Sequence, residues 1–121
     1  MHIFAVEKCA ADLRRLRRAI IEAFPEAELD AFTDPMLAVK QGVTRSLPDL
    51  LLCEGELKHM DGFTLAEMLR RQRPELAVII LTEDEACRHK AEEHMLQAIK
   101  KPVTAQALRQ ALPTYTPKIG G

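Results

Sequence analysis

The sequence predicts an α/β fold of three layers, in which helices cover both faces of a parallel β-sheet. Two short runs, 50–53 and 76–81, are apolar without any polar alternation, and this pattern is typical of strands buried on both faces of a parallel sheet. Segments with helical periodicity alternate with these runs and with three weaker strand-like segments. Such alternation favours a parallel sheet with right-handed crossover connections. The sequence therefore predicts five strand–helix units.

The first two units are marked by apolar periodicity and by helix-ending residues. A short strand at 3–6 precedes a helix at 12–24, whose apolar residues form one stripe and which Pro25 ends. Residues 27–32 alternate small or apolar residues with charge, which suits an edge strand. Thr33-Asp34-Pro35 predicts the start of a second helix, and Gly42 its end.

The last three units follow the same pattern. The apolar run at 50–53 ends at Glu54, and a loop leads to a helix at 63–71. The run at 76–81 ends at Thr82, and the acidic residues 83–85 predict a helix N-terminus. A strand at 95–99, a Lys-Pro turn and a cap at Thr104 introduce the final helix. Five units of this size favour the flavodoxin-like strand order 2-1-3-4-5.

Composition limits the class of protein. The 121 residues, 47% of them hydrophobic, suit one domain with a real core, here expected over 1–113, with 114–121 as a tail or the start of a linker. A net charge of −1 argues against nucleic acid as a direct partner. No signal peptide or membrane span is recognisable, so a cytoplasmic protein with no membrane partner is expected. One local basic cluster favours a solvated helix face over a binding site, namely Arg14, Arg15, Arg17 and Arg18.

The cysteines, histidines and methionines are assigned no chemistry. Three widely spaced cysteines, without a CxxC pair, indicate reduced thiols: Cys9, Cys53 and Cys87. Three histidines lack metal-ligand spacing and are expected to be exposed: His59, His89 and His94. Four methionines are expected in or near the core: Met36, Met60, Met68 and Met95.

Polar residues follow four of the predicted strands. In open α/β sheets, ligands bind outside the carboxyl ends of the strands. This edge brings Glu7 and Lys8 together with Glu54, and it places Thr82 and Lys101 at the neighbouring strand ends. The sequence therefore predicts a charged site at this edge.

Residues at these positions resemble a known family over nearly the whole chain. The segment 48–63 is similar to the strand and loop that carry the phospho-accepting aspartate of response regulator receiver domains (CheY-like domains). Residues 80–82 resemble the strand that ends in the family's hydroxyl residue. Lys101–Pro102 resembles its Lys-Pro turn, whose peptide bond is typically cis. Within the family, residues 24–33, His94 and 101–104 are most similar to receivers of LytTR-type transcriptional regulators.

The resemblance implies a phosphorylation site, and this chain departs from it at two positions. In the family, two acidic residues and the acceptor aspartate hold Mg²⁺, while the threonine and lysine contact phosphoryl oxygens. Here the acidic pair is Glu7 and Lys8, and the acceptor position holds Glu54. A cation beside Mg²⁺ is repulsive, and a longer carboxylate displaces the phosphorus, although positioning dominates phosphoryl transfer. We therefore expect the Mg²⁺ site to be lost, with no cofactor and no metal, and phosphorylation to be absent or impaired.

An ion pair is expected in place of the metal. Opposite charges this close favour both ionised forms, so the prediction is a Lys8–Glu54 or Lys101–Glu54 pair, with the Lys8 amine taking the position of the divalent ion. A fixed, active-like state and a decayed structural site remain equally open.

Switching and partner binding are also predicted from the resemblance. Ala98 lies where many receivers carry a tyrosine or phenylalanine that reports phosphorylation, so conventional switching is expected to be lost. The face formed by the last two helices and the strand between them is the place where receivers commonly dimerise. Expected partners are proteins, such as a sensor kinase or an output domain.

The sequence favours one of three functions. A phosphorylation-independent interaction module without enzymatic activity is favoured, either alone or as the N-terminal part of a LytTR-type transcription regulator. The alternative is a phosphorylation-competent receiver that uses Glu54, or a neighbour such as Asp61, as acceptor. A small enzyme or flavin-binding domain is disfavoured because the first loop, 7–11, contains no glycine.

Overall fold

Strands and helices alternate along the whole described chain. The structure is a computed structural model, and it describes residues 1–112; the predicted tail therefore lies outside the described residues. The elements are β1 (His2–Val6), α1 (Ala10–Ala23), β2 (Glu28–Phe32), α2 (Pro35–Thr44), β3 (Leu50–Glu54), α3 (Gly62–Gln72), β4 (Ala77–Thr82), α4 (Glu85–Glu93), β5 (Gln97–Lys100) and α5 (Ala105–Ala111).

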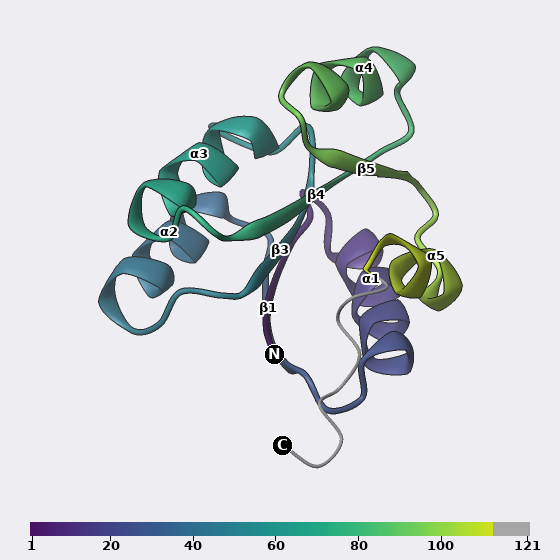
Figure 1. Ribbon diagram of the computed structural model, residues 1–121. Helices are drawn as coiled ribbons and strands as arrows, with labels where there is room; N and C mark the ends of the chain where they lie inside the picture. Colours follow the sequence, from purple (N-terminus) through teal and green to yellow (C-terminus); the bar gives the residue numbers. More distant parts are fainter. Residues whose placement is uncertain (113–121) are drawn as a thin grey trace.

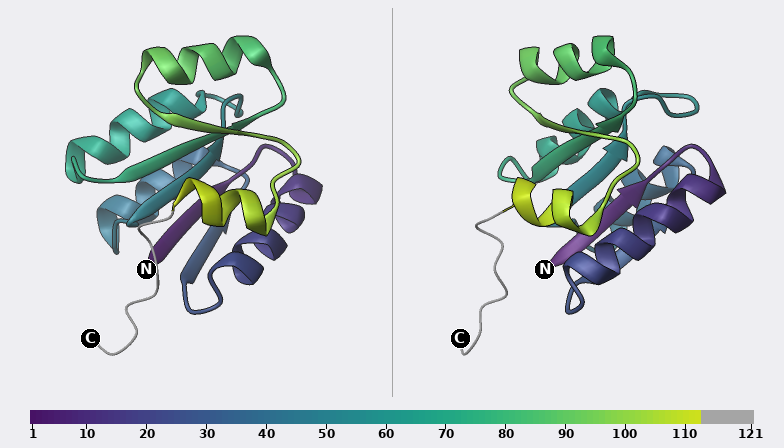
Figure 2. Two further views of the ribbon diagram at one scale, coloured as in Figure 1. Left: turned by 45° about the vertical axis from the view of Figure 1, so that its right-hand side comes forward. Right: turned by 90° about the vertical axis from the view of Figure 1, so that its right-hand side faces the viewer.

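The predicted sheet is confirmed. The five strands are parallel and lie in the order β2-β1-β3-β4-β5. Figures 1 and 2 show α1 and α5 on one side of the sheet and α2 and α3 on the other. Residues 27–32, predicted as an edge strand, form β2 at the end of the sheet. This is the three-layer, flavodoxin-like arrangement.

Each face of the sheet has its own core. On one face the inner side chains of β1, β3 and β4 pack against α1 and α5, and on the other they pack against α2, α3 and α4. Leu50, Leu51, Leu52 and Cys53 are all fully buried. The absence of polar alternation in that run thus reflects burial on both faces of the sheet.

Helix termini follow local capping chemistry. Asp34 accepts a hydrogen bond from the Met36 amide at the start of α2, and Thr104 accepts one from the Ala107 amide at the start of α5. The predicted end of α2 at Gly42 is wrong, because the helix continues to Thr44. Gly42 is an interior packing position, where an added Cβ would lie 3.1 Å from Leu69 Cδ2.

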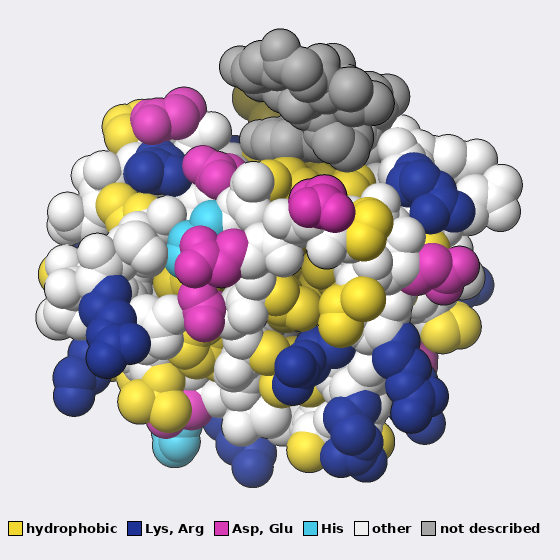
Figure 3. Space-filling view, turned by 90° about the horizontal axis from the view of Figure 1, so that it is seen from below, with side chains coloured by type: hydrophobic (Ala, Val, Ile, Leu, Met, Phe, Trp, Pro, Cys, Tyr) yellow, Lys and Arg dark blue, Asp and Glu magenta, His cyan; other side chains and the backbone are white. Residues whose placement is uncertain are grey.

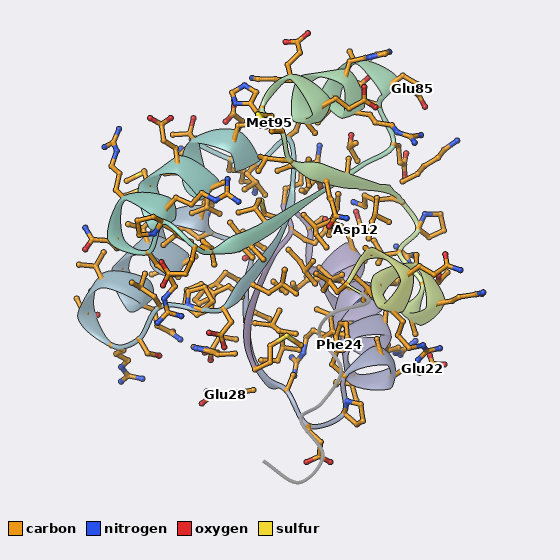
Figure 4. The ribbon with its side chains drawn as sticks, viewed as in Figure 1. Asp12, Glu22, Phe24, Glu28, Glu85 and Met95 are labelled. Atoms are coloured by element: carbon orange, nitrogen blue, oxygen red, sulfur yellow. The ribbon has the colours of Figure 1, made fainter. Side chains whose placement is uncertain are left out.

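Two of the four methionines contradict the prediction of core packing. Met36 is 47% exposed on the outer face of α2, and Met95 is 92% exposed. Met95 has a positive φ of 58°, and its amide donates to Glu92 O in the turn that ends α4. It therefore belongs to a helix-ending turn, and β5 begins only at Gln97. Figure 4 shows Met95 beside the end of α4.

The remaining surface is mixed in character. Figure 3, a view from below, shows acidic, basic and hydrophobic side chains interspersed on that face. The four arginines of α1 are exposed, as predicted, and so are His59, His89 and His94. The three cysteines are free thiols, and burial raises the pKa of Cys53 above its usual value. None of the helices between residues 1 and 112 is both long enough and apolar enough to cross a membrane.

Candidate functional site

The carboxyl edge of the sheet carries an open pocket of about 280 Å³. Its lining comes from the ends of β3 and β4, the loop after β1 and the start of α1, and the residues after β5. The lining residues are Lys8, Asp12, Glu54, Glu56, Thr82, Glu83, Asp84 and Lys101. Because carboxylates outnumber lysines in this set, the pocket presents a net negative charge.

The Lys101 ammonium lies at the centre of the site. Lys101 Nζ donates to Glu7 Oε2 at 3.0 Å, to Asp12 Oδ2 at 3.0 Å and to Glu54 Oε1 at 3.3 Å. The backbone holds this lysine in place, since its amide donates to Thr82 O. The Lys101–Pro102 peptide bond is cis, as expected. One ammonium therefore joins three carboxylates that come from two strand ends and a helix.

Glu7 and Glu54 are carried by the strands themselves. Glu54 is the last residue of β3, and Glu7 directly follows β1, where its amide continues the ladder by donating to Phe32 O. The side chain of Glu7 is 1% exposed and that of Glu54 is 8% exposed. They are the two buried charged residues among the described ones, so their position is fixed by the sheet.

The site contains more negative charge than one lysine can balance. Burial, together with the nearby Glu54 carboxylate, raises the pKa of Glu7 to about 7 despite the hydrogen bond from Lys101. Burial alone would lower the pKa of Lys101, but its bonds to Glu7 and Asp12 outweigh that effect and raise it above its usual value. The lysine therefore stays charged, while Glu7 exchanges a proton near neutral pH.

Asp12 belongs to the site, although the sequence predicts it only as the start of the first helix. Figure 4 shows it near the start of α1, beside the sheet. Its hydrogen bond from Lys101 lowers its pKa below the usual value. Its place in the first turn of α1 could have indicated its role, because the loop after β1 brings this turn close to the strand ends.

Lys8 does not occupy the position predicted for it. Its ammonium lies 3.8 Å from Glu56 Oε2, and its side chain is 49% exposed. The expectation that the Lys8 amine replaces the divalent ion is therefore wrong, whereas the alternative Lys101–Glu54 pair is present. Lys8 lies in the bend that follows β1, and its long side chain extends to Glu56 in the pocket lining, away from the three carboxylates that surround Lys101.

Thr82 and Ala98 lie on the β4–β5 side of the site. Thr82 is the last residue of β4, and its hydroxyl oxygen accepts a hydrogen bond from the Asp84 amide at 3.0 Å. Ala98 lies on β5 opposite Ile80 and packs, half-buried, against the core. No large side chain stands at Ala98 to change rotamer.

The three carboxylates of the site have the right chemistry for binding a divalent ion, but their arrangement does not suit one. Glu7, Asp12 and Glu54 each offer an oxygen, and these atoms lie within 4.8 Å of one another. Mg²⁺ requires oxygen ligands at about 2.0–2.1 Å in octahedral geometry. The Lys101 ammonium already lies 3.0–3.3 Å from all three carboxylates, and it supplies a like charge and no lone pair. The residues as arranged therefore do not fit Mg²⁺.

Close backbone contact fixes the position of Glu54. Gly62, the first residue of α3, donates its amide to Gly55 O at 2.8 Å, and a Cβ at Gly62 would lie 2.4 Å from Glu54 O. Asp61 caps the same helix through the Thr64 amide. Burial alone would raise the pKa of the Asp61 carboxyl, but the hydrogen bonds from Thr64 and Lys90 outweigh burial and lower this pKa below its usual value. Asp61 is therefore engaged at the α3 terminus rather than in the Lys101 cluster.

Comparison with known proteins gives a family match over most of the chain. The model for the response regulator receiver domain matches residues 4–113. A curated relative, protein-glutamate methylesterase/protein-glutamine glutaminase of Nitrosomonas europaea, is 32% identical over 117 residues. That match covers 93% of this chain but only 32% of the relative, so the chain spans about a third of the relative's length.

Solved structures have the same fold. The receiver domain protein of Clostridium thermocellum superposes with a TM-score of 0.79 at 18% identity, covering 93% of this chain and 91% of that one. The receiver domain of an HD domain-containing protein of Pseudomonas fluorescens gives a TM-score of 0.77 at 28% identity, covering 93% and 84%. The topology described above is therefore shared with these domains.

Proposed function

Because the chain belongs to the family of response regulator receiver domains, we propose that it acts in two-component signalling as a protein-interaction module that does not depend on phosphorylation. Its partners are proteins, such as a sensor kinase or an output domain, and the domain has no catalytic activity of its own. Of the expected partner surfaces, the α4–β5–α5 face is the one proposed for homodimer formation.

One observation carries this proposal: Lys101 Nζ lies within 3.3 Å of all three carboxylates of the site. In the family resemblance, this lysine contacts phosphoryl oxygens and the carboxylates hold Mg²⁺. Here the lysine donates its hydrogen bonds to the carboxylates themselves. A phosphoryl group entering the pocket would meet a net negative lining and would have to compete with Asp12 and Glu7 for the ammonium. This competition adds a free-energy cost to phosphorylation, which supports a site that keeps the Lys101–carboxylate pairing and does not switch.

The output of a longer protein is part of the same proposal. Similarity at 24–33, His94 and 101–104 favours a cytoplasmic LytTR-type regulator of transcription, in which the present domain would precede the DNA-binding part. The curated relative is named for a different output, methylesterase and glutaminase activity.

A second candidate is a receiver that is still phosphorylated. The observation in its favour is the grouping of Glu7, Asp12 and Glu54, in which Asp12 would supply the acidic ligand that Lys8 cannot. Glu54 would then be the acceptor. This function requires Lys101 to leave the carboxylates.

The test is titration with Mg²⁺ and beryllofluoride, a phosphoryl analogue, followed by NMR and by melting temperature. For the wild-type protein we expect no saturable shift. For the double variant Lys8→Asp with Glu54→Asp we expect a saturable shift at the carboxyl edge, because the shorter carboxylate withdraws from Lys101 and a second acidic residue stands beside Glu7.

The matched control changes the same residue types at exposed positions, Lys58→Asp with Glu67→Asp, and should behave like the wild type. Incubation with acetyl phosphate, read by intact mass, separates the two functions. A Mg²⁺-dependent gain of one phosphoryl group in the wild type would refute the proposal and establish the second candidate.

A further inference from the structure

Helix α2 has an unusual distribution of side-chain size. Its buried residues are small or compact, namely Pro35, Ala38 and Gly42. Its large apolar residues face outward: Met36 is 47%, Leu37 54% and Val43 57% exposed. Three of the six exposed large hydrophobic residues in the described chain therefore lie on this one ten-residue helix.

The tight inner packing of α2 explains why these side chains cannot turn inward. A Cβ at Gly42 would already lie 3.1 Å from Leu69 Cδ2 and 3.2 Å from Leu47 Cδ2. Figures 1 and 2 show α2 at the periphery, with α3 as its helical neighbour and no described element over its outer side. By contrast, α1 buries Leu16 and Ile20 and exposes its arginines.

A groove lies beside this apolar face. It has a volume of about 250 Å³ and is lined by Phe32 of the edge strand β2 and by Leu37, Lys40, Gln41, Thr44 and Arg45. The aromatic and aliphatic side chains give it apolar walls, and the two cations lie among them. A large apolar side chain of a partner would fit such a site.

The charge of the groove is entirely positive. Its lining includes Lys40 and Arg45 but no carboxylate, and neither cation forms an ion pair within the described residues. Helix α2 contains no acidic residue, and the carboxylate of its capping residue Asp34 is engaged with the Met36 amide.

We infer that the outer face of α2, together with the adjoining groove, binds an acidic amphipathic helix of a partner protein. The apolar side chains of that helix would pack on Met36 and Val43 and enter the groove beside Leu37, and its carboxylates would pair with Lys40 and Arg45. Met36 and Val43 lie seven residues apart, about 10 Å along the helix, which matches two turns of a docked helix. The inference rests on the proposed function only in treating the domain as a protein-binding module, because this surface is separate from the Lys101 cluster.

The probe is a fluorescein-labelled synthetic peptide of about 18 residues, long enough to form a helix, with leucine at helical spacing and glutamate on the flanks. A second peptide carries lysine in place of every glutamate. We expect the acidic peptide to bind by fluorescence anisotropy and to shift NMR signals of α2 and β2, and the basic peptide to bind at least about tenfold more weakly. Leu37→Glu and Lys40→Glu should each weaken the acidic peptide about tenfold, and Lys40→Glu with Arg45→Glu should favour the basic one.

Matched controls come from α1, where Ile21→Glu replaces an equally exposed apolar residue and Arg17→Glu an exposed cation. Both should bind like the wild type. No binding of the acidic peptide, or equal loss in the α1 controls, would overturn the inference. Concentration-dependent dimerisation that Leu37→Glu abolishes would also overturn it, because the occupant would then be a second copy. Neither result would affect the beryllofluoride test, so the two proposals fail independently.

Discussion

Glu7 is a buried carboxyl group that pairs with Lys101 and also binds a proton near neutral pH. Three carboxylates share the single ammonium of Lys101, and the most buried of them has a pKa raised to about 7 by burial. The folded protein therefore holds a proton that the unfolded chain releases near pH 4.5, the ordinary value for a glutamate. Between these two pH values the folded state binds more protons than the unfolded state, so stability falls as pH rises.

Replacing Glu7 with glutamine should remove this pH dependence. The wild-type free energy of unfolding should fall by up to about 3 kcal/mol between pH 4.5 and pH 7, since one pKa unit corresponds to about 1.4 kcal/mol. Glu7→Gln should show a flat profile over this window and exceed the wild type in stability at pH 8. Urea unfolding at a series of pH values provides the measurement, with the exposed Glu67→Gln as control. A wild-type stability that rises from pH 4.5 to pH 7 would contradict the assigned proton.

Within the charged site, Glu7, Glu54 and Lys101 could be predicted from the sequence, whereas Asp12 and Lys8 could not. These three residues lie at or directly after the carboxyl ends of strands, and those ends meet at one edge of a parallel sheet. Asp12 follows no strand, so its arrival at the same ammonium depends on the path of the first loop. The prediction for Lys8 is wrong because a position after a strand does not determine which way a long side chain turns, and Lys8 extends to Glu56.

Close packing between α3 and β3 sets the position of Glu54. Gly62 begins α3, and any Cβ there would overlap Glu54 O, a backbone atom that cannot easily move. At Gly42 in α2, a Cβ would instead meet the flexible ends of Leu69 and Leu47 at 3.1 and 3.2 Å. The same substitution should therefore have different consequences in the two helices.

Gly62→Ala should destabilise the domain, while Gly42→Ala should change its stability little. The helix gains about 1 kcal/mol of propensity from alanine at an interior position, and overpacking typically costs about 1–3 kcal/mol. At Gly42 the gain in helix propensity and the cost of overpacking nearly cancel. At Gly62 the first helical position gains less and the overlap is with backbone, so we expect a net loss of about 1–3 kcal/mol. Denaturant unfolding measures both variants, and an equal effect at the two sites would contradict this account.

The elements themselves were largely predictable, and the exceptions have a common cause. Apolar runs predict β3 and β4, capping residues predict the starts of α2 and α5, and the acidic residues 83–85 predict the start of α4. Met36 and Met95 were wrongly placed in the core because apolar character alone does not tell which way a side chain points. Gly42 was taken for a helix end, whereas its lack of a side chain allows α2 to approach α3. Such contacts between elements are not encoded in local periodicity.

At the scale of the whole molecule, alternation of strands and helices predicts a parallel sheet, and five units of this size favour the observed flavodoxin-like strand order. Burial is unevenly distributed around that sheet. Helix α3 buries Phe63, Leu65, Ala66 and Leu69 as well as Gly62, whereas α4 buries only Ala91. Additional contacts of α4 are polar or aromatic: Lys90 lies 3.5 Å from Asp61 Oδ2 and 4.7 Å from the Phe63 ring centroid, and His94 lies against the same ring.

This difference predicts that α4 opens independently of the rest of the domain. Local opening requires less free energy where few apolar contacts are lost, so in native-state hydrogen exchange the α4 amides should exchange before those of α3 and of the buried strands β1 and β3. Lys90→Met should accelerate α4 exchange about threefold, because an exposed cation–π contact contributes about 0.5–1 kcal/mol, while leaving β1 and β3 unchanged. Arg88→Met, which removes only a 4.0 Å contact with Glu85, serves as control. Exchange of α4 at the same rate as β3 would show that the helix is held by the global unfolding equilibrium, and the α4–β5–α5 face would then behave as one rigid surface.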